Sequence, residues 1–171
     1  MNSTLKYIFH FTFIILVQVL ILQNINIPIG SFTLSIFVFP LVIILLPFEL
    51  ENYLALLFAF ALGLITDMFY NSPGVFASAS VFAAFIRPLI LSLNEPKTGY
   101  GRDNAPLISS MGLVWFLKYS VPIVLAFILF YCLVEVFAFS RFGVALLEVV
   151  ISLPISMVFV VLYVLILNPK L

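Results

Sequence analysis

Residues 53–93 read YLALLFAFALGLITDMFY, then NSPG, then VFASASVFAAFIRPLILSL. The two apolar runs, 53–70 and 75–93, are each close to the roughly 20 residues that a helix needs to cross a bilayer. The connection at 71–74 is a strong turn signal, and so short a turn joins antiparallel neighbours. The stretch therefore predicts a hairpin of two membrane-spanning helices.

Small residues recur every four positions along the first run and share one helical face with an acid. They are Ala55, Ala59 and Gly63, followed by Asp67. The second run begins after Gly74 and is rich in small side chains from Ser78 onward. Small side chains let two backbones approach closely within a membrane. We therefore expect these residues to form a tight helix–helix contact or to receive a partner helix.

The whole chain follows this pattern of apolar runs and short polar connections. Of its 171 residues, 65% are hydrophobic and 8% are charged, whereas a soluble domain has roughly a quarter charged. We expect transmembrane helices at about residues 5–22, 31–48, 53–70, 75–93, 112–137 and 143–167. Residues 1–171 are thus predicted to form a single transmembrane domain, an all-α bundle of about six helices. The first run lacks a cleavage site after it and is expected to be retained.

Basic residues are distributed unequally between the two expected sides. Lys6, Lys97, Arg102 and Lys170 lie on the side of the chain ends, and Arg141 lies on the opposite side. Cytoplasmic connections of membrane proteins carry the excess of Lys and Arg. We therefore predict that both termini are cytoplasmic.

The sequence contains few of the residues that catalysis requires. His10 is the only histidine and Cys132 the only cysteine, which excludes a cluster of these ligands for a metal. A serine nucleophile would have only His10 as an imidazole base, and we expect His10 to pack or to lie at the interface. The net charge is zero, which gives no sign of nucleic-acid binding. We predict no enzymatic activity, no metal and no cofactor.

Four ionisable residues stand out inside the predicted spans, away from the basic residues at the span ends, because a charge there is costly and usually marks function or an internal partner. They are Asp67, Arg87, Glu135 and Glu148. Asp67 is either a polar anchor for a partner helix or ion, or a cap that accepts from backbone N–H groups of the turn after it. Arg87 is expected to snorkel to the cytoplasmic surface, or else to pair with Glu49 or Glu51.

Glu135, Arg141 and Glu148 surround the connection between the last two predicted spans. One interpretation is an ion-paired cap on that hairpin. The other is an acidic site in the outer leaflet, shared with Asp67 and facing a partner. Both remain open from the sequence.

Pro40, Pro122 and Pro154 lie inside the second, fifth and sixth predicted spans. Proline removes a backbone donor, and lipid cannot satisfy the carbonyl that is freed, so neighbouring helices or local rewinding must do so. We interpret each proline as a kink in a tight bundle, in preference to a broken helix that lines a cavity.

The hairpin at 53–93 also resembles a known family. Its sequence is similar to a run in the rod shape-determining protein MreD family. The similar positions are GLITD at 63–67, Gly74 and the small-residue run that ends in FIRP at 85–88. Two further stretches resemble the Bacteroidetes-type members of that family. They are VQ at 17–18 together with the end of the first span at 22–27, and GLVWF at 112–116. The residues of the family's motif that are matched in this chain are Gly63, Asp67 and Gly74.

The resemblance implies a non-enzymatic subunit of the bacterial cell-shape and peptidoglycan elongation complex, the elongasome, in the inner membrane. Its expected direct partner is MreC, a bitopic protein with a large periplasmic part. Through MreC it would connect to MreB, to the RodA glycosyltransferase and to a class B transpeptidase.

In fold, the family also resembles the substrate-binding membrane subunits of vitamin transporters. A subunit of this type is therefore the alternative function. It predicts a cavity at the outer side lined by Asp67, Glu135 or Glu148, with tryptophan or tyrosine walls.

Overall fold

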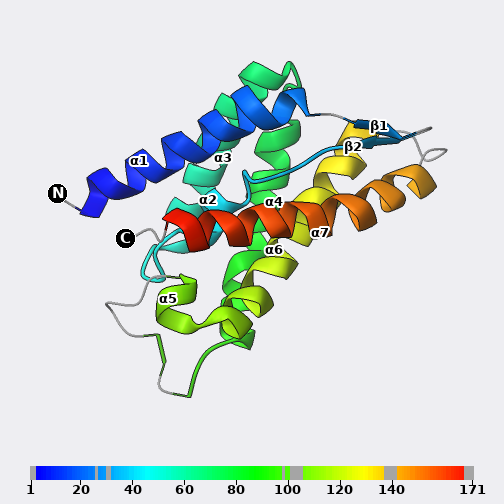
Figure 1. Ribbon diagram of the computed structural model, residues 1–171. Coiled ribbons are helices and arrows are strands. Elements are labelled where there is room, and N and C mark those ends of the chain that lie inside the picture. The colour runs from blue at the N-terminus through cyan, green and yellow to red at the C-terminus, as the bar shows by residue number, and fades with distance from the viewer. Residues whose placement is uncertain are drawn as a thin grey trace.

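A computed structural model of the protein describes residues 3–25, 27–29, 32–97, 99–100, 106–136 and 142–167. Five long apolar helices dominate these residues (Figure 1). They are α1 (Ser3–Leu16), α3 (Asn52–Tyr70), α4 (Val75–Leu93), α6 (Leu113–Val136) and α7 (Phe142–Leu167). Each is long enough to cross a bilayer, α1 together with the π-helical turn Val17–Ile21 and the 3-10 turn Leu22–Asn24 that continue it. The chain is an all-α, multi-pass membrane protein, as its composition predicts.

Four short elements complete the described fold. Strands β1 (Ile27–Ile29) and β2 (Phe32–Leu34) pair as an antiparallel hairpin, with Ile27 opposite Leu34. Helix α2 (Leu41–Ile44) lies in the return from this hairpin, and α5 (Ile108–Met111) precedes α6.

The predicted second span, residues 31–48, does not form a long helix. After β2 the chain is extended at residues 35–38, turns at Pro40 and has only the single turn of α2 before the loop that leads to α3. All side chains from residue 36 to residue 46 are buried. We call residues 35–47 the unwound crossing. The prediction of a helix here was wrong, and Pro40 marks a broken segment, not a kink.

Two features of the sequence disfavour a helix at this place. Pro40 has no N–H, so in a helix the carbonyl of Ile36 would lose its partner. Ile36 and Val38, in the extended part, are β-branched, and such side chains fit extended chain better than helix. Non-helical backbone is tolerated at membrane depth where protein surrounds it, which is the case for this buried segment.

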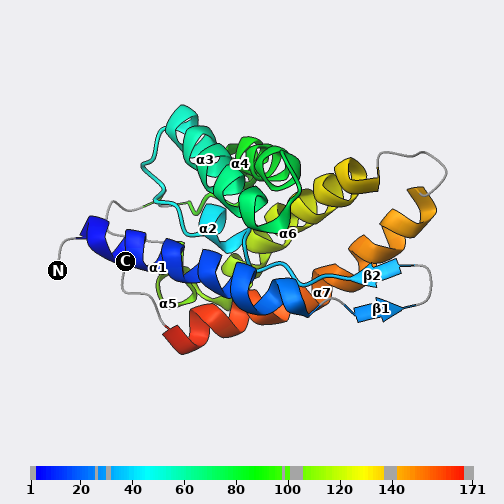
Figure 2. The same ribbon diagram turned by 90° about the horizontal axis from the view of Figure 1, so that it is seen from above.

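Helix α4 is the centre of the bundle. It packs against α3 on one side and α6 on the other, and α6 packs against α7 (Figure 2). Side chains of the unwound crossing insert between these helices: the ring of Phe37 lies 4.7 Å from that of Tyr131, and the ring of Phe39 lies 5.7 Å from that of Phe127. The crossing is therefore part of the core.

The path of the crossing follows from its contacts. At one end of the bundle, which we call the turn end, Phe37 packs against Phe76, two residues after the α3–α4 turn at 71–74. At the opposite end, Leu46 contacts Arg87 near the other end of α4. Figure 1 shows α1 running to the β hairpin and the crossing running back. With five helices and one unwound crossing, the described residues traverse the bundle six times.

The start of α1 and the end of α7 lie at the same end of the molecule (Figure 1). His10 in α1 lies against Tyr163 in α7, with Nδ1 3.2 Å from the tyrosine hydroxyl. His10 therefore has a packing role here, one of the two that the sequence suggested.

Candidate functional site

Three buried polar side chains of the bundle, Gln18, Arg87 and Ser156, bond to the unwound crossing. Gln18, which is 1% exposed, lies in the π-helical turn that follows α1. Its Oε1 accepts the backbone N–H groups of Val38 at 2.8 Å and Phe39 at 3.1 Å. Its Nε2 donates to the carbonyl of Ile36 at 3.1 Å. This is the carbonyl that Pro40 would orphan in a helix, so one amide replaces the missing helical bonds.

Tyr70, the last residue of α3, holds Gln18 in place. Its hydroxyl accepts from Gln18 Nε2 at 2.8 Å and donates to the Gln18 main-chain carbonyl at 3.1 Å. The side-chain amide of Gln18 thus uses two donors and two acceptor positions, which is the full capacity of an amide. A fully satisfied buried amide fixes its neighbours in one arrangement.

Ser156 in α7 supplies another partner at the turn end. Its Oγ accepts the backbone N–H of Phe37 at 2.9 Å, and the residue is fully buried. Three consecutive backbone N–H groups of the crossing, at residues 37–39, are therefore bonded to side chains of two different helices.

Arg87 performs the same task at the opposite end. It is 1% exposed, and its Nη2 donates to the carbonyls of Leu46 at 2.7 Å and Pro47 at 3.0 Å. Its Nε donates to the hydroxyl of Tyr119 at 2.9 Å. The expectation that Arg87 snorkels was wrong, and these bonds go to neutral oxygens, not to Glu49 or Glu51, which are exposed.

Tyr119 in α6 extends this contact to α2. Its hydroxyl, which accepts from Arg87, donates to the carbonyl of Ile44 at 3.2 Å. The last carbonyls of a helix have no partner within it. The guanidinium and the phenol together satisfy the carbonyls at the end of α2 and in the loop after it.

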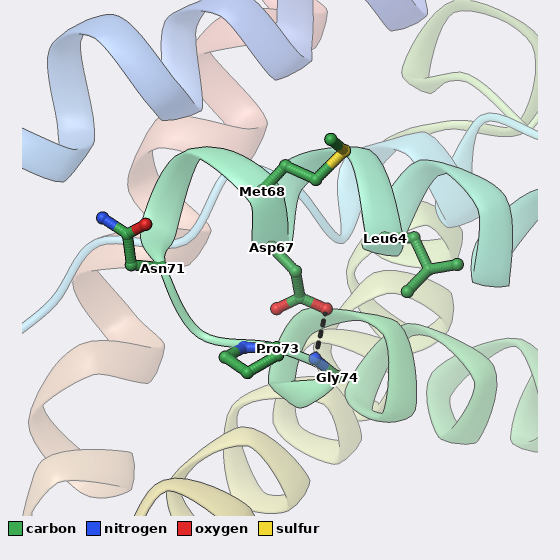
Figure 3. Close-up of a pocket in the computed structure, with 6 residues that line it drawn as sticks. All are labelled: Leu64, Asp67, Met68, Asn71, Pro73 and Gly74. Atoms are coloured by element: carbon green, nitrogen blue, oxygen red, sulfur yellow. Dashed lines mark hydrogen bonds between the residues drawn. The ribbon is translucent and has the colours of Figure 1, made fainter.

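Asp67 is the cap that the sequence offered as one of two alternatives (Figure 3). Oδ1 accepts from the Ser72 hydroxyl at 3.1 Å and from the Phe76 N–H at 2.8 Å. Oδ2 accepts the N–H groups of Gly74 at 3.1 Å and Ala77 at 3.0 Å. These four donors match the roughly four acceptor sites of a carboxylate, and two of them are free N–H groups in the first turn of α4. Little capacity is left for an ion or a partner helix.

The predicted stripe of small residues packs against α4. Ala55 and Ala59 are 2% exposed, and Gly63 is buried. A Cβ at Gly63 would lie 2.6 Å from the Ala77 Cα, so only glycine fits this contact. Ser78 is half-buried, and its hydroxyl donates to the carbonyl of Val75 within α4. The tight hairpin is as predicted, and its small face is occupied within the chain.

Gly74 has a conformational role in the same turn. Its φ of 89° is in the left-handed region that favours glycine. This conformation turns its N–H toward Asp67 Oδ2 (Figure 3). Gly63, Asp67 and Gly74 therefore all serve the close contact between α3 and the start of α4.

A shallow pocket of about 390 Å³ opens beside this turn, and Figure 3 shows the residues around it. It is lined by Leu64, Asp67, Met68, Asn71, Pro73 and Gly74. Neither Glu135 nor Glu148 lines it. Trp115 lies at the opposite end of the bundle, where its Nε1 donates to the carbonyl of Asn94 at 2.9 Å. The pocket is thus lined by Asp67, one of the three acids that the transporter alternative names, but by no tryptophan or tyrosine.

The other outer acids lie near the connection between α6 and α7. Glu135 is exposed in the last turn of α6, and Glu148 is half-buried in the second turn of α7. Arg141, the predicted ion-pair partner, lies outside the described residues. The ion-paired cap and the acidic site therefore both stay predictions.

Sequence reasoning missed Gln18, Ser156 and Tyr119 as members of the polar core. A signal for Gln18 was available, because it is a strongly polar residue inside an apolar span, where such residues usually hydrogen-bond across helices. Serine and tyrosine are too common in membrane helices to single out.

Comparisons of the chain with protein-family models, with curated proteins and with solved structures find no match.

Proposed function

We propose that the protein is a non-enzymatic subunit of the bacterial cell-shape and peptidoglycan elongation complex, a scaffold that binds an MreC-like bitopic membrane protein. The resemblance of GLITD at 63–67, Gly74 and FIRP at 85–88 to the MreD family supports it. Through this partner the subunit connects indirectly to MreB, RodA and a class B transpeptidase.

One observation carries the proposal beyond the resemblance: four prominent buried polar side chains serve the chain's own backbone. Gln18, Asp67, Arg87 and Ser156 all bond to main-chain groups. A catalytic or ligand-binding site instead directs polar groups into a cavity. Because these four groups are used internally, the protein would act through its surface, which is what a scaffold requires.

The proposal includes a location in the bacterial inner membrane with both termini cytoplasmic. Among the described residues, Lys97, four residues after α4, and Lys118, in the second turn of α6, are exposed near the end of the bundle opposite the α3–α4 turn. The start of α1 lies at that end too. Basic residues at this end favour a cytoplasmic position for it.

A substrate-binding subunit of a vitamin-type transporter is the second candidate. The 390 Å³ pocket beside Asp67 favours it, because its volume is in the range of small-molecule sites. The one ionisable side chain in its lining is Asp67, which already accepts four hydrogen bonds.

The test is purification of a tagged copy from its own host in mild detergent, followed by mass spectrometry of the proteins that accompany it. An unrelated tagged multi-pass protein is the control for non-specific recovery. We expect an MreC-like bitopic protein together with wall-synthesis enzymes. Recovery of nucleotide-binding transport subunits instead would overturn the proposal in favour of the second candidate.

A further inference from the structure

Arg87 makes fewer hydrogen bonds than its guanidinium allows. The group has five N–H donors, and three of them are used. Nε donates to the Tyr119 hydroxyl, and Nη2 donates to the carbonyls of Leu46 and Pro47. Nη1 makes no hydrogen bond within the described part of the chain. Two N–H donors of a side chain that is 1% exposed therefore remain uncommitted.

The positive charge of Arg87 also lacks an opposite charge beside it. Its three acceptors are neutral oxygens, and it forms no ion pair among the described residues. The acids at the same end of the bundle, Glu49, Glu51 and Glu95, are exposed. A buried charge is costly unless an opposite charge compensates it. Arg87 thus offers both a charge and two N–H donors to an anion.

The uncommitted nitrogen is the part of Arg87 that a ligand can reach. Within the described residues, Ser120 Oγ is the fully enclosed side-chain atom that lacks a hydrogen-bond partner. Nη1 lacks a partner too but is not enclosed in this way, so the small exposed part of Arg87 includes this nitrogen. An anion can therefore contact Nη1 while the bonds to Leu46 and Pro47 stay in place.

The guanidinium lies beside a cluster of three half-buried aromatic side chains, Phe48, Tyr100 and Trp115. Phe48 directly follows Pro47, an acceptor of Arg87, and its ring lies 4.4 Å from that of Tyr100. The ring of Trp115 stacks on that of Tyr119, with 5.0 Å between their centroids. Tryptophan and tyrosine gather where the hydrocarbon meets the headgroups of a bilayer. The guanidinium is therefore near the depth of the lipid phosphates.

We propose that Arg87 Nη1 binds the phosphate of a phospholipid headgroup. Arginine recognises phosphate through its planar set of N–H donors. Basic pockets between transmembrane helices bind anionic headgroups in this way, and Arg87 lies between α4, α6 and the unwound crossing. Phospholipid surrounds a membrane bundle on all sides, so it is the source of phosphate at this depth. The site is independent of the proposed function, because it is the same for a scaffold and for a transporter subunit.

The experiment is a lipid titration of the purified full-length protein in a neutral detergent. Trp115 is the only tryptophan and stacks on Tyr119, so its fluorescence reports on this site. We expect phosphatidylglycerol to change the fluorescence saturably. Diacylglycerol with the same acyl chains, which has no phosphate, should leave it unchanged. Equal responses to the two lipids would overturn the inference, and a saturable response to inorganic phosphate at the same concentrations would overturn the lipid as its source.

A pair of variants separates Arg87 from general attraction to basic residues. Arg87→Gln removes the charge and should weaken phosphatidylglycerol binding by roughly ten- to a hundredfold. Lys118→Gln is the matched control, because Lys118 is exposed at the same end of the bundle, and its effect should stay within about twofold. Thermal unfolding without lipid shows whether each variant folds. Equal losses of binding in the two folded variants would contradict a specific site at Arg87.

A measurement that keeps Arg87 applies if Arg87→Gln does not fold. The double variant Arg102→Lys, Arg141→Lys leaves Arg87 as the only arginine. With ¹⁵N-labelled arginine in phosphatidylglycerol bilayers, solid-state NMR should then detect lipid ³¹P beside the guanidinium nitrogens. The absence of such a contact would overturn the inference.

A carboxylate of a partner protein is the other anion that could meet Arg87. It would be the ligand if a folded Arg87→Gln variant bound phosphatidylglycerol like the wild type but no longer recovered a bitopic protein on purification. That result would overturn the lipid site and leave the proposed function standing. Loss of lipid binding with normal recovery of the bitopic protein is the result that we expect.

Discussion

The backbone N–H of Phe76 donates to the carboxylate of Asp67 at 2.8 Å, so a side chain near the end of α3 caps the first turn of α4. A capping side chain usually precedes its helix by one residue in the sequence. Here it reaches across a turn from the neighbouring helix. The contact therefore fixes the angle of the hairpin as well as the start of α4.

Replacing Asp67 should destabilise the protein in a way that partner binding does not explain. Asp67→Ala leaves the N–H groups of Phe76 and Ala77 without their acceptor. We expect the free energy of unfolding to fall by about 2–3 kcal/mol, measured on purified protein without partners. Ser72→Ala removes one hydroxyl donor to the same carboxylate and should cost about 1 kcal/mol or less. Equal stability of Asp67→Ala and wild type would contradict the cap.

Two glycine substitutions should have opposite effects. Gly63→Ala places a Cβ 2.6 Å from the Cα of Ala77 and must push α3 and α4 apart, with an expected cost of about 1–3 kcal/mol. Gly143→Ala, in the first turn of α7, meets nothing within 4 Å and should be neutral or slightly stabilising. Thermal unfolding of the two variants side by side provides the check. If both behave alike, the close approach at Gly63 is not what limits that position.

Gln18 should be the most sensitive polar residue at the turn end. Gln18→Leu keeps the volume but leaves the N–H groups of Val38 and Phe39 unpaired, so we expect a loss of about 3 kcal/mol or more. Gln23→Leu is the control, because the bond of Gln23 to the Phe69 carbonyl is exposed and should contribute far less. A Gln18→Leu variant that unfolds at the wild-type temperature would show that the crossing does not depend on this amide.

Tyr119→Phe tests the opposite end of the crossing. It removes the acceptor of Arg87 Nε and the donor to the Ile44 carbonyl, in a residue that is fully buried. The expected loss is about 1–3 kcal/mol. Tyr131→Phe, about three turns away in the same helix, changes a buried tyrosine outside this network and should cost less. A larger effect at Tyr131 would argue against the assigned role of Tyr119.

The sequence predicted what depends on hydropathy and local spacing. The five long helices follow from apolar runs, and the tight α3–α4 contact follows from the spacing of Ala55, Ala59 and Gly63. The cap formed by Asp67 was foreseeable as one of two alternatives, because its donors lie within ten residues along the chain.

The unwound crossing was not predictable, because hydropathy does not distinguish a buried extended segment from a helix of the same composition. Its hydrogen bonds come from residues 18 to 119 positions away, which only the assembled bundle brings together. The position of Arg87 was missed for the same reason. The carbonyls of Leu46 and Pro47 are available as its partners only when the chain there is not helical.

The central claim is that residues 35–38, the first part of the unwound crossing, run through the bundle as extended chain held by side chains of the surrounding helices. Its most direct test is solid-state NMR of the protein in lipid bilayers, with ¹³C labels in phenylalanine and valine. The account predicts extended-chain Cα and Cβ shifts for Phe37 and Val38, and helical shifts for Phe76 and Val124. Helical shifts at Phe37 and Val38 would contradict it and would restore the second transmembrane helix.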